Sequence, residues 1–93
     1  MRHRGRANKR DTNEPEIIQA LEAIGCSVCQ IDAPADLLVG YKVRNFILEI
    51  KSKDGKQTKE QVDFALTWRG QYRIVKTPEE AIDLVTKAYG RKD

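Results

Sequence analysis

The chain has 93 residues, a length typical of a single domain. Its hydrophobic fraction of 40% is enough for a small core, and its longest apolar runs, residues 37–39 and 46–48, are too short to span a bilayer. No signal-peptide hydrophobic segment follows the basic start, so we expect neither a membrane protein nor a secreted precursor. Two cysteines without an export signal predict a reducing cytoplasm rather than a disulfide scaffold.

The net charge of +3 is unevenly distributed along the chain. Residues 1–10 contain five basic side chains and no acid, whereas the rest has 12 basic side chains against all 14 acids, a balance of −2. The five basic residues are Arg2, Arg4, Arg6, Lys9 and Arg10. This pattern predicts a flexible tail over residues 1–12 that binds a polyanion, with nucleic acid the first candidate. A solubilising leader is the alternative.

Helix caps, apolar periodicity and turn residues divide residues 13–90, expected to be the single domain, into the order αβββαβα. The expected elements are a helix at about 13–24, strands at 26–31, 36–39 and 45–51, a helix at 59–68, a strand at 72–75 and a helix from 77 to about 89. Residues 40–44 are expected to connect two strands, and Val62, Ala65 and Leu66 to form the apolar face of the second helix. Thr77 and Glu80 have capping-box spacing.

The strand at 45–51 carries two charged residues in an otherwise apolar run. Strand periodicity places Glu49 and Lys51 on one face with Ile47, and the other apolar residues on the opposite face. If this strand pairs with residues 36–39, Asp36 lies close to Glu49 and Lys51.

Converging carboxylates repel each other unless a cation lies between them, and Mg²⁺ or Mn²⁺ suits such hard oxygen ligands. Such an ion could generate a hydroxide-like nucleophile from bound water and polarise a phosphodiester. A neighbouring lysine could orient the attacking water or neutralise charge on the phosphate. The alternative is an exposed salt bridge between Glu49 and Lys51.

Glu14 favours the metal interpretation. At 100° per residue it lies beside the apolar stripe of Ile17, Ile18 and Leu21, so this acid faces inward and needs a partner. A metal shared with Asp36 and Glu49, or Lys51 itself, would supply one. Alternatively, Glu14 only interacts favourably with the helix dipole.

These residues resemble the PD-(D/E)XK nuclease superfamily, and within it the small stand-alone VRR-NUC domains of phages. The similarity covers residues 13–85 and includes Glu14 in the first helix, the stretch from Ala35 to Gly40, Glu49–Ile50–Lys51, and Gln61 at the start of the next helix. One departure is that Ala35 separates Pro34 from Asp36, where the name-giving motif has proline and aspartate adjacent.

The resemblance implies a restriction-endonuclease-like core with a mixed central sheet flanked by helices. It implies that Asp36, Glu49 and the backbone carbonyl of Ile50 bind Mg²⁺ or Mn²⁺, and that Glu14 helps directly or through water. Lys51 would act on the nucleophile, and Gln61 would position water or substrate. Gln61 could equally form a capping box with Thr58. The implied setting is the cytoplasm of a bacterial or phage-infected cell.

Several other side chains have weaker signals. Lys53, Lys56, Lys59 and Arg69 flank the proposed site and could contact phosphates or form a solvated face. The pair Cys26 and Cys29 lacks further zinc ligands, and we expect it to pack as small apolar residues. We expect Phe64, Trp68 and Tyr72 to lie in the core or a subunit interface; the Trp68–Arg69 pair could instead touch nucleic acid.

The sequence therefore predicts a metal-dependent DNA endonuclease. The resemblance suggests a homodimer that cleaves Holliday junctions, flaps or other branched DNA, without a membrane partner or a small-molecule cofactor. A second hypothesis is a non-catalytic nucleic-acid-binding module with a basic N-terminal arm. A third is an accessory domain that binds a partner and has no role in nucleic acid.

Overall fold

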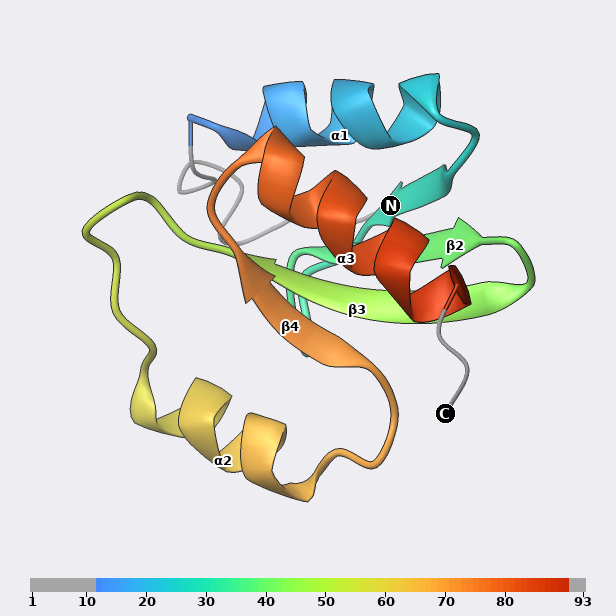
Figure 1. The fold of residues 1–93 in the computed structure, drawn as a ribbon. Coiled ribbons are helices and arrows are strands. Elements are labelled where there is room, and N and C mark those ends of the chain that lie inside the picture. The colour runs from blue at the N-terminus through green and yellow to red at the C-terminus, as the bar shows by residue number, and fades with distance from the viewer. Residues whose placement is uncertain (1–11, 91–93) are drawn as a thin grey trace.

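The structure, a computed structural model, describes residues 12–90 and has the predicted element order (Figure 1). The elements are α1 (Glu14–Ala23), β1 (Ser27–Gln30), β2 (Leu37–Tyr41), β3 (Arg44–Ile50), α2 (Lys59–Thr67), β4 (Tyr72–Val75) and α3 (Pro78–Gly90). The predicted basic tail from Arg2 to Arg10 lies outside the described residues. Within the described range, no helix is both long enough and apolar enough to cross a membrane.

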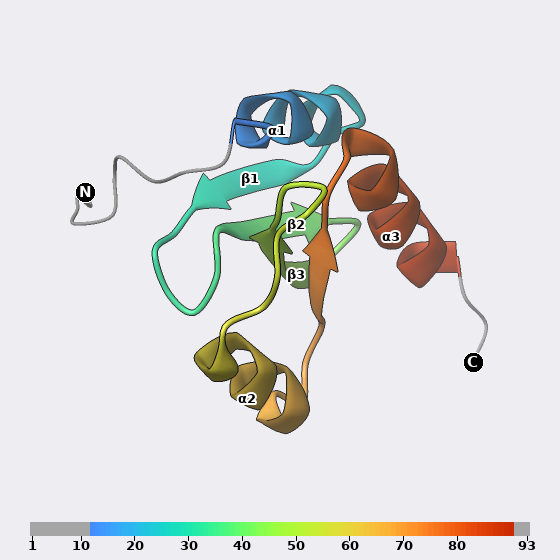
Figure 2. The same ribbon diagram turned by 90° about the vertical axis from the view of Figure 1, so that its left-hand side faces the viewer.

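The four strands form one mixed sheet in the order β1-β2-β3-β4. The first three strands are antiparallel, and β4 is parallel to β3, so the connection between them must cross over the sheet. That connection contains α2. Helices α1 and α3 cover one face of the sheet and α2 lies on the other (Figures 1 and 2). The predicted α/β class with a mixed sheet flanked by helices is therefore confirmed.

The hydrophobic core lies between the sheet and the pair α1 and α3. Alternate residues of β3 enter it, and Phe46, Leu48 and Ile50 are each at most 1% exposed, as strand periodicity predicts. The remaining core residues are Ile17, Leu21, Cys26, Leu37, Val39, Val75, Ala81 and Val85. The face of β3 that carries Glu49 consequently points away from this core.

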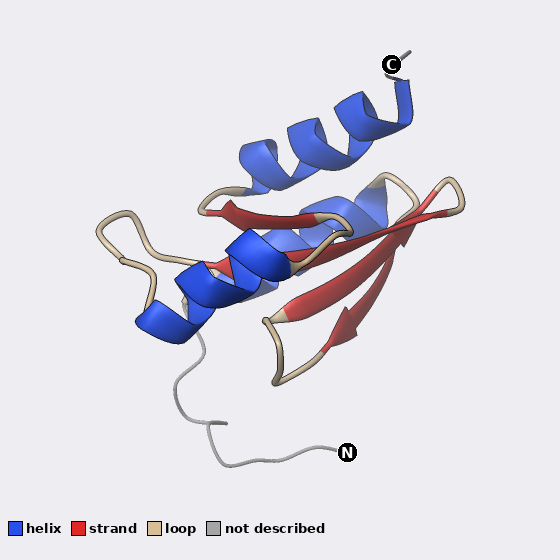
Figure 3. Cartoon of the chain, turned by 90° about the horizontal axis from the view of Figure 1, so that it is seen from below, coloured by secondary structure: helices blue, strands red, loops and turns tan. Residues whose placement is uncertain are grey.

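The predicted apolar face of α2 is wrong. Val62 is 39% exposed and Leu66 78% exposed, Ala65 is exposed too, and α2 has no buried residue. The face that approaches the sheet instead carries Gln61 and Phe64, and the Phe64 ring meets the Tyr72 ring edge-on at 4.9 Å. From below, α2 lies on the viewer's side of the sheet (Figure 3).

Two local details also differ from the prediction. Strand β2 continues to Tyr41, so the β2–β3 loop is only Lys42 and Val43, both at positive φ (53° and 58°). The hairpin connection at residues 40–44 is predicted, but its two-residue loop is not, because that loop contains neither glycine nor asparagine. At the start of α3, Thr77 accepts the Glu80 N–H at 3.0 Å as predicted, but the Glu80 carboxylate accepts the N–H of Lys76.

Candidate active site

The β2–β3 hairpin brings the predicted carboxylates together at one end of the sheet. Leu37 pairs with Leu48, and extending this register by one residue sets Asp36 opposite Glu49. Asp36 and Glu49 are only 4% and 6% exposed. The side chains from the start of β2 and the end of β3 therefore form a buried carboxylate pair, and the alternative of an exposed Glu49 is wrong.

Asp36 is fixed by the backbone of β3. Its Oδ2 accepts the N–H of Ile50 at 2.8 Å. The N–H and C=O of one strand residue point to the same side, so the backbone carbonyl of Ile50 also points toward β2 and Asp36. Three oxygen-bearing groups, those of Asp36, Glu49 and Ile50, thus lie at this end of the hairpin.

Glu49 is the most perturbed acid of the site. Burial and the adjacent negative charge of Asp36 raise its pKa to about 7, against the lowering effect of Lys51. The Lys51 Nζ lies 3.6 Å from Glu49 Oε2. Glu49 therefore holds its proton more tightly than an isolated carboxyl, because burial and a close negative charge both disfavour its ionised form.

Lys51 is held at both its backbone and its side chain. Its N–H donates to the Val75 carbonyl at 3.1 Å, and its carbonyl accepts the Asn13 side-chain amide at 3.2 Å. Gly55 lies against the side chain, where an added Cβ would be 3.3 Å from the Lys51 Cβ and Cδ. The turn after β3 thus packs on the lysine and leaves its side chain 16% exposed.

Gln61 forms the capping box with Thr58 that the sequence left as one alternative, and it also contacts Glu49. Its Oε1 accepts the Thr58 N–H at 2.9 Å, and the Thr58 hydroxyl accepts the Gln61 N–H, so a complete capping box begins α2. Its Nε2 donates to Glu49 Oε2 at 2.7 Å. One amide thereby couples the first turn of α2 to the carboxylate pair.

Glu14 faces inward as predicted and is 1% exposed. Its Oε2 accepts a hydrogen bond of 2.8 Å from Gln30 Nε2 at the end of β1. Across residues 12–90, no group of three or more His, Cys, Asp or Glu side chains could hold a metal ion. Glu14 therefore does not join Asp36 and Glu49 in a three-carboxylate cluster. Any role of Glu14 at a metal ion would require an intervening water molecule.

Three further residues lie beside the site. Asn13 occupies the N-cap position of α1 without a side-chain cap hydrogen bond, and its amide instead donates to the carbonyls of Lys51 and Lys76, which ties α1 to the ends of β3 and β4. Gln30 carried no signal, because its partner depends on the strand order. Tyr72 is buried, as expected of a core residue, and its pairing with Ile47 places it on the Glu49 face of the sheet.

The predicted phosphate contacts are surface residues. Lys53, Lys56, Lys59 and Arg69 are all exposed, and Lys59 Nζ lies 3.3 Å from Asp63 Oδ2. Such an exposed pair contributes little stability, so Lys59 can exchange it for another anion at little cost. Cys26 packs in the core as expected, whereas Cys29 is exposed, and both thiols are free.

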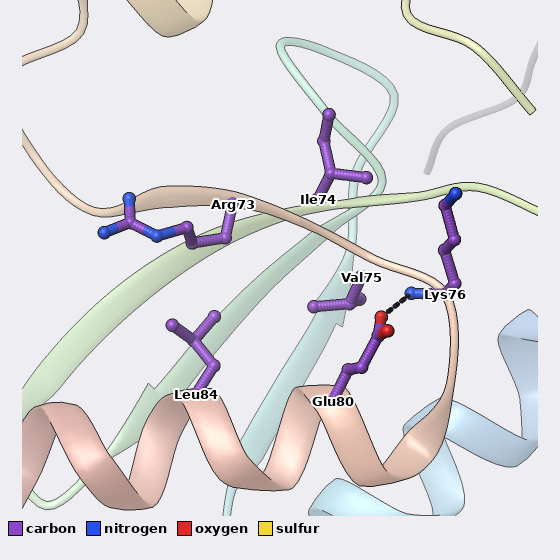
Figure 4. A pocket seen from close by; sticks show the side chains of 6 residues that line it. All are labelled: Arg73, Ile74, Val75, Lys76, Glu80 and Leu84. Carbon is purple, nitrogen blue, oxygen red and sulfur yellow. Dashed lines mark hydrogen bonds between the residues drawn. The ribbon is translucent and has the colours of Figure 1, made fainter.

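A pocket of about 320 Å³ lies elsewhere, between β4 and α3 (Figure 4). It is lined by Arg73, Ile74, Val75, Lys76, Glu80 and Leu84. Neither Asp36 nor Glu49 borders it, and Glu80 already binds the Lys76 N–H at 2.7 Å. The carboxylate pair, rather than this pocket, remains the candidate active site.

In comparisons with known proteins, no family model, no curated protein and no solved structure matches the chain. The functional interpretation therefore depends on the chemistry of the residues around Asp36 and Glu49.

Proposed function

We propose that this chain is a divalent-metal-dependent DNA endonuclease with a restriction-endonuclease-like core, similar to the VRR-NUC group. The observation that carries the proposal is the buried pair Asp36 and Glu49, with Lys51 3.6 Å from Glu49. Burial of two facing carboxylates costs stability unless a cation or a proton offsets their charge. The raised pKa of Glu49 reflects this burial and the nearby charge of Asp36, and a bound cation would offset the same charge.

The donor set suits Mg²⁺ or Mn²⁺. These ions commonly take one or two protein carboxylates and fill their other positions with water and substrate phosphate oxygens. Asp36, Glu49 and the backbone carbonyl of Ile50 would hold the ion. When bound, it would supply the positive charge that lowers the pKa of water and polarises a phosphodiester.

The remaining side chains have roles that follow from their contacts. Lys51 would orient the attacking water or neutralise the phosphate, since its ammonium already lies beside Glu49. Gln61 would keep Glu49 in position through its 2.7 Å hydrogen bond. Glu14, held by Gln30, would act through water.

Branched DNA is the substrate that we propose on the family resemblance, and a homodimer is the assembly, because two related sites could cut two strands. Exposed Lys53 and Lys59 would contact phosphates beside the site. The basic residues from Arg2 to Arg10 would add further phosphate contacts.

The test is cleavage of labelled duplex, flap, splayed-arm and four-way-junction DNA with Mg²⁺, Mn²⁺ or EDTA. Wild type should cut at least one branched substrate only with a divalent ion. Asp36→Asn and Lys51→Ala should each lower the cleavage rate by roughly 100-fold or more. Asp83→Asn is the matched control, because Asp83 is an exposed α3 residue paired with Lys87.

Equal cleavage by wild type, Asp36→Asn and Lys51→Ala would refute this site. Steeply salt-dependent DNA binding without metal-dependent cleavage by wild type would favour the non-catalytic binding module instead.

A further inference from the structure

Tyr72 presents a buried hydroxyl with no hydrogen-bond partner. The residue is 7% exposed, and its hydroxyl oxygen is one of two buried side-chain polar atoms in the described chain that lack a partner. Buried hydroxyl groups are normally satisfied by protein or by bound water. The Tyr72 hydroxyl can therefore donate a hydrogen bond to a water or a ligand bound beside it.

The fold directs Tyr72 toward the carboxylate pair. It pairs with Ile47, and its neighbour Ile74 pairs with Glu49, so Tyr72 lies on the same face of the sheet as Glu49 and one diagonal step away. Phe64 of α2 packs edge-on against the Tyr72 ring and keeps it in this orientation.

The electrostatics agree with this placement. Burial raises the pKa of Tyr72, and so do the negative charges of Glu49 and then Asp36. The side chain of Gln57 has a smaller opposing effect, although it makes no hydrogen bond of ordinary geometry with the hydroxyl. The phenol thus remains protonated and available as a donor within the field of both acids.

We propose that Tyr72 is a positioning residue whose hydroxyl donates a hydrogen bond to a water of a hydrated divalent cation held by Asp36 and Glu49. This inference rests on the proposed metal site and adds a group from β4 to it. A water fits the hydroxyl better than a phosphodiester does, because Phe64 and the sheet leave the oxygen buried. Outer hydrogen-bond partners of this kind fix the hydration shell and raise metal affinity.

The experiment compares Mn²⁺ binding to the EDTA-stripped full chain by isothermal titration calorimetry. Tyr72→Phe should bind Mn²⁺ about 10-fold or more weakly than wild type. Its urea unfolding midpoint without metal should equal or exceed that of wild type, because the substitution removes only an unsatisfied hydroxyl. Tyr41→Phe is the matched control, since Tyr41 lies at the opposite end of β2, and it should match wild type in Mn²⁺ affinity.

The role of Tyr72 and the metal site itself can be refuted separately. If Tyr72→Phe binds Mn²⁺ like wild type while Asp36→Ala does not bind, the role of Tyr72 is refuted and the metal site stands. A lower metal-free urea midpoint for Tyr72→Phe would show that the hydroxyl has a protein partner, which would also overturn the inference. Absence of Mn²⁺ binding by wild type would overturn the metal site itself.

Discussion

At the scale of single residues, burial of Glu49 destabilises the fold when its carboxylate is ionised, and the same carboxylate is a candidate metal ligand. Its pKa is raised to about 7, so the folded state binds its proton more tightly than an unfolded chain with a pKa near 4.5. The contribution of Glu49 to the free energy of unfolding is therefore most favourable below pH 4.5, falls as the pH rises through 7, and stays reduced above it.

We expect Glu49→Gln to remove this pH dependence. In EDTA the variant should be about as stable as wild type at pH 4.5 and more stable at pH 8, because the amide carries no charge to bury. Urea unfolding at the two pH values measures the difference. Saturating Mg²⁺ should reverse the order at pH 8 by stabilising only wild type. An unchanged pH dependence in the variant would assign the cost to another group.

Val43 destabilises the fold for a different reason, its backbone conformation. Its φ of 58° lies in the left-handed region, which a β-branched residue rarely adopts, and its side chain is fully exposed. We expect Val43→Gly to raise the free energy of unfolding by about 1 kcal/mol, because glycine removes the steric penalty without losing a buried contact. Val62→Gly, at an exposed position within α2, should instead destabilise, and urea denaturation of both variants checks this contrast.

The principal site residues could be predicted because strand periodicity is a local property. Alternation alone puts Glu49 and Lys51 on one face, and a hairpin brings Asp36 opposite Glu49. The roles of Gln30 and Tyr72 could not be predicted, because their neighbours depend on strand order and register across the sheet. The hydrogen bonds of Asn13 to Lys51 and Lys76 could not be predicted either, because they join residues 38 and 63 positions apart in the sequence.

At the scale of elements, α2 differs from the other helices in how it is attached. It has nine residues and none is buried. Its attachments are the capping box at Thr58, the hydrogen bond from Gln61 to Glu49, and the contact of Phe64 with Tyr72. An isolated helix of this length is marginal in water, so these few contacts keep α2 folded on the sheet.

We therefore expect α2 to open more readily than α1 or α3. Thr58→Ala removes the cap and should destabilise α2 by about 1 kcal/mol, with faster amide exchange confined to residues 59–67. Hydrogen exchange followed by mass spectrometry measures this effect. Thr86→Ala, at an exposed position of α3, is the control. Faster exchange throughout the protein in Thr58→Ala would contradict a local role for the cap.

The prediction that Val62, Ala65 and Leu66 face the sheet was wrong because few contacts attach α2 to the sheet, and those contacts decide which side faces it. Periodicity correctly predicted a helix, and Val62, Ala65 and Leu66 do lie on a common side, but the sequence does not indicate which side meets the sheet. The Gln61–Glu49 hydrogen bond and the Phe64–Tyr72 contact turn the helix so that the more apolar side stays exposed. Helices α1 and α3 were better predicted, since their stripes enter the core.

At the scale of the whole molecule, the two faces of the sheet differ in what they contact. One face builds the core with α1 and α3, while the other carries Glu49, Tyr72 and the contacts of α2. Asn13 joins the ends of β3 and β4 to the start of α1, next to Glu14. Packing of the core face therefore fixes the backbone of β2 and β3, while the opposite face presents the side chains of the candidate site.

The distribution of charge gives a prediction for the entire chain. Removing residues 1–10 takes away five cations and changes the net charge from +3 to −2. If these side chains bind phosphates, the truncated chain should bind DNA more weakly at low salt, and its plot of log affinity against log salt should be flatter by up to about 4 units. Fluorescence anisotropy over a salt series, in EDTA to prevent cleavage, measures both effects.

Single-turnover cleavage at saturating enzyme separates binding from chemistry in the truncated chain. We expect its rate to remain near that of the full chain, because Asp36, Glu49 and Lys51 make their contacts within residues 12–90. Replacing only Lys53 and Lys59 with alanine in the full chain should flatten the salt plot by up to about 2 units. Equal salt dependence of the full and truncated chains would show that residues 1–10 do not bind phosphates.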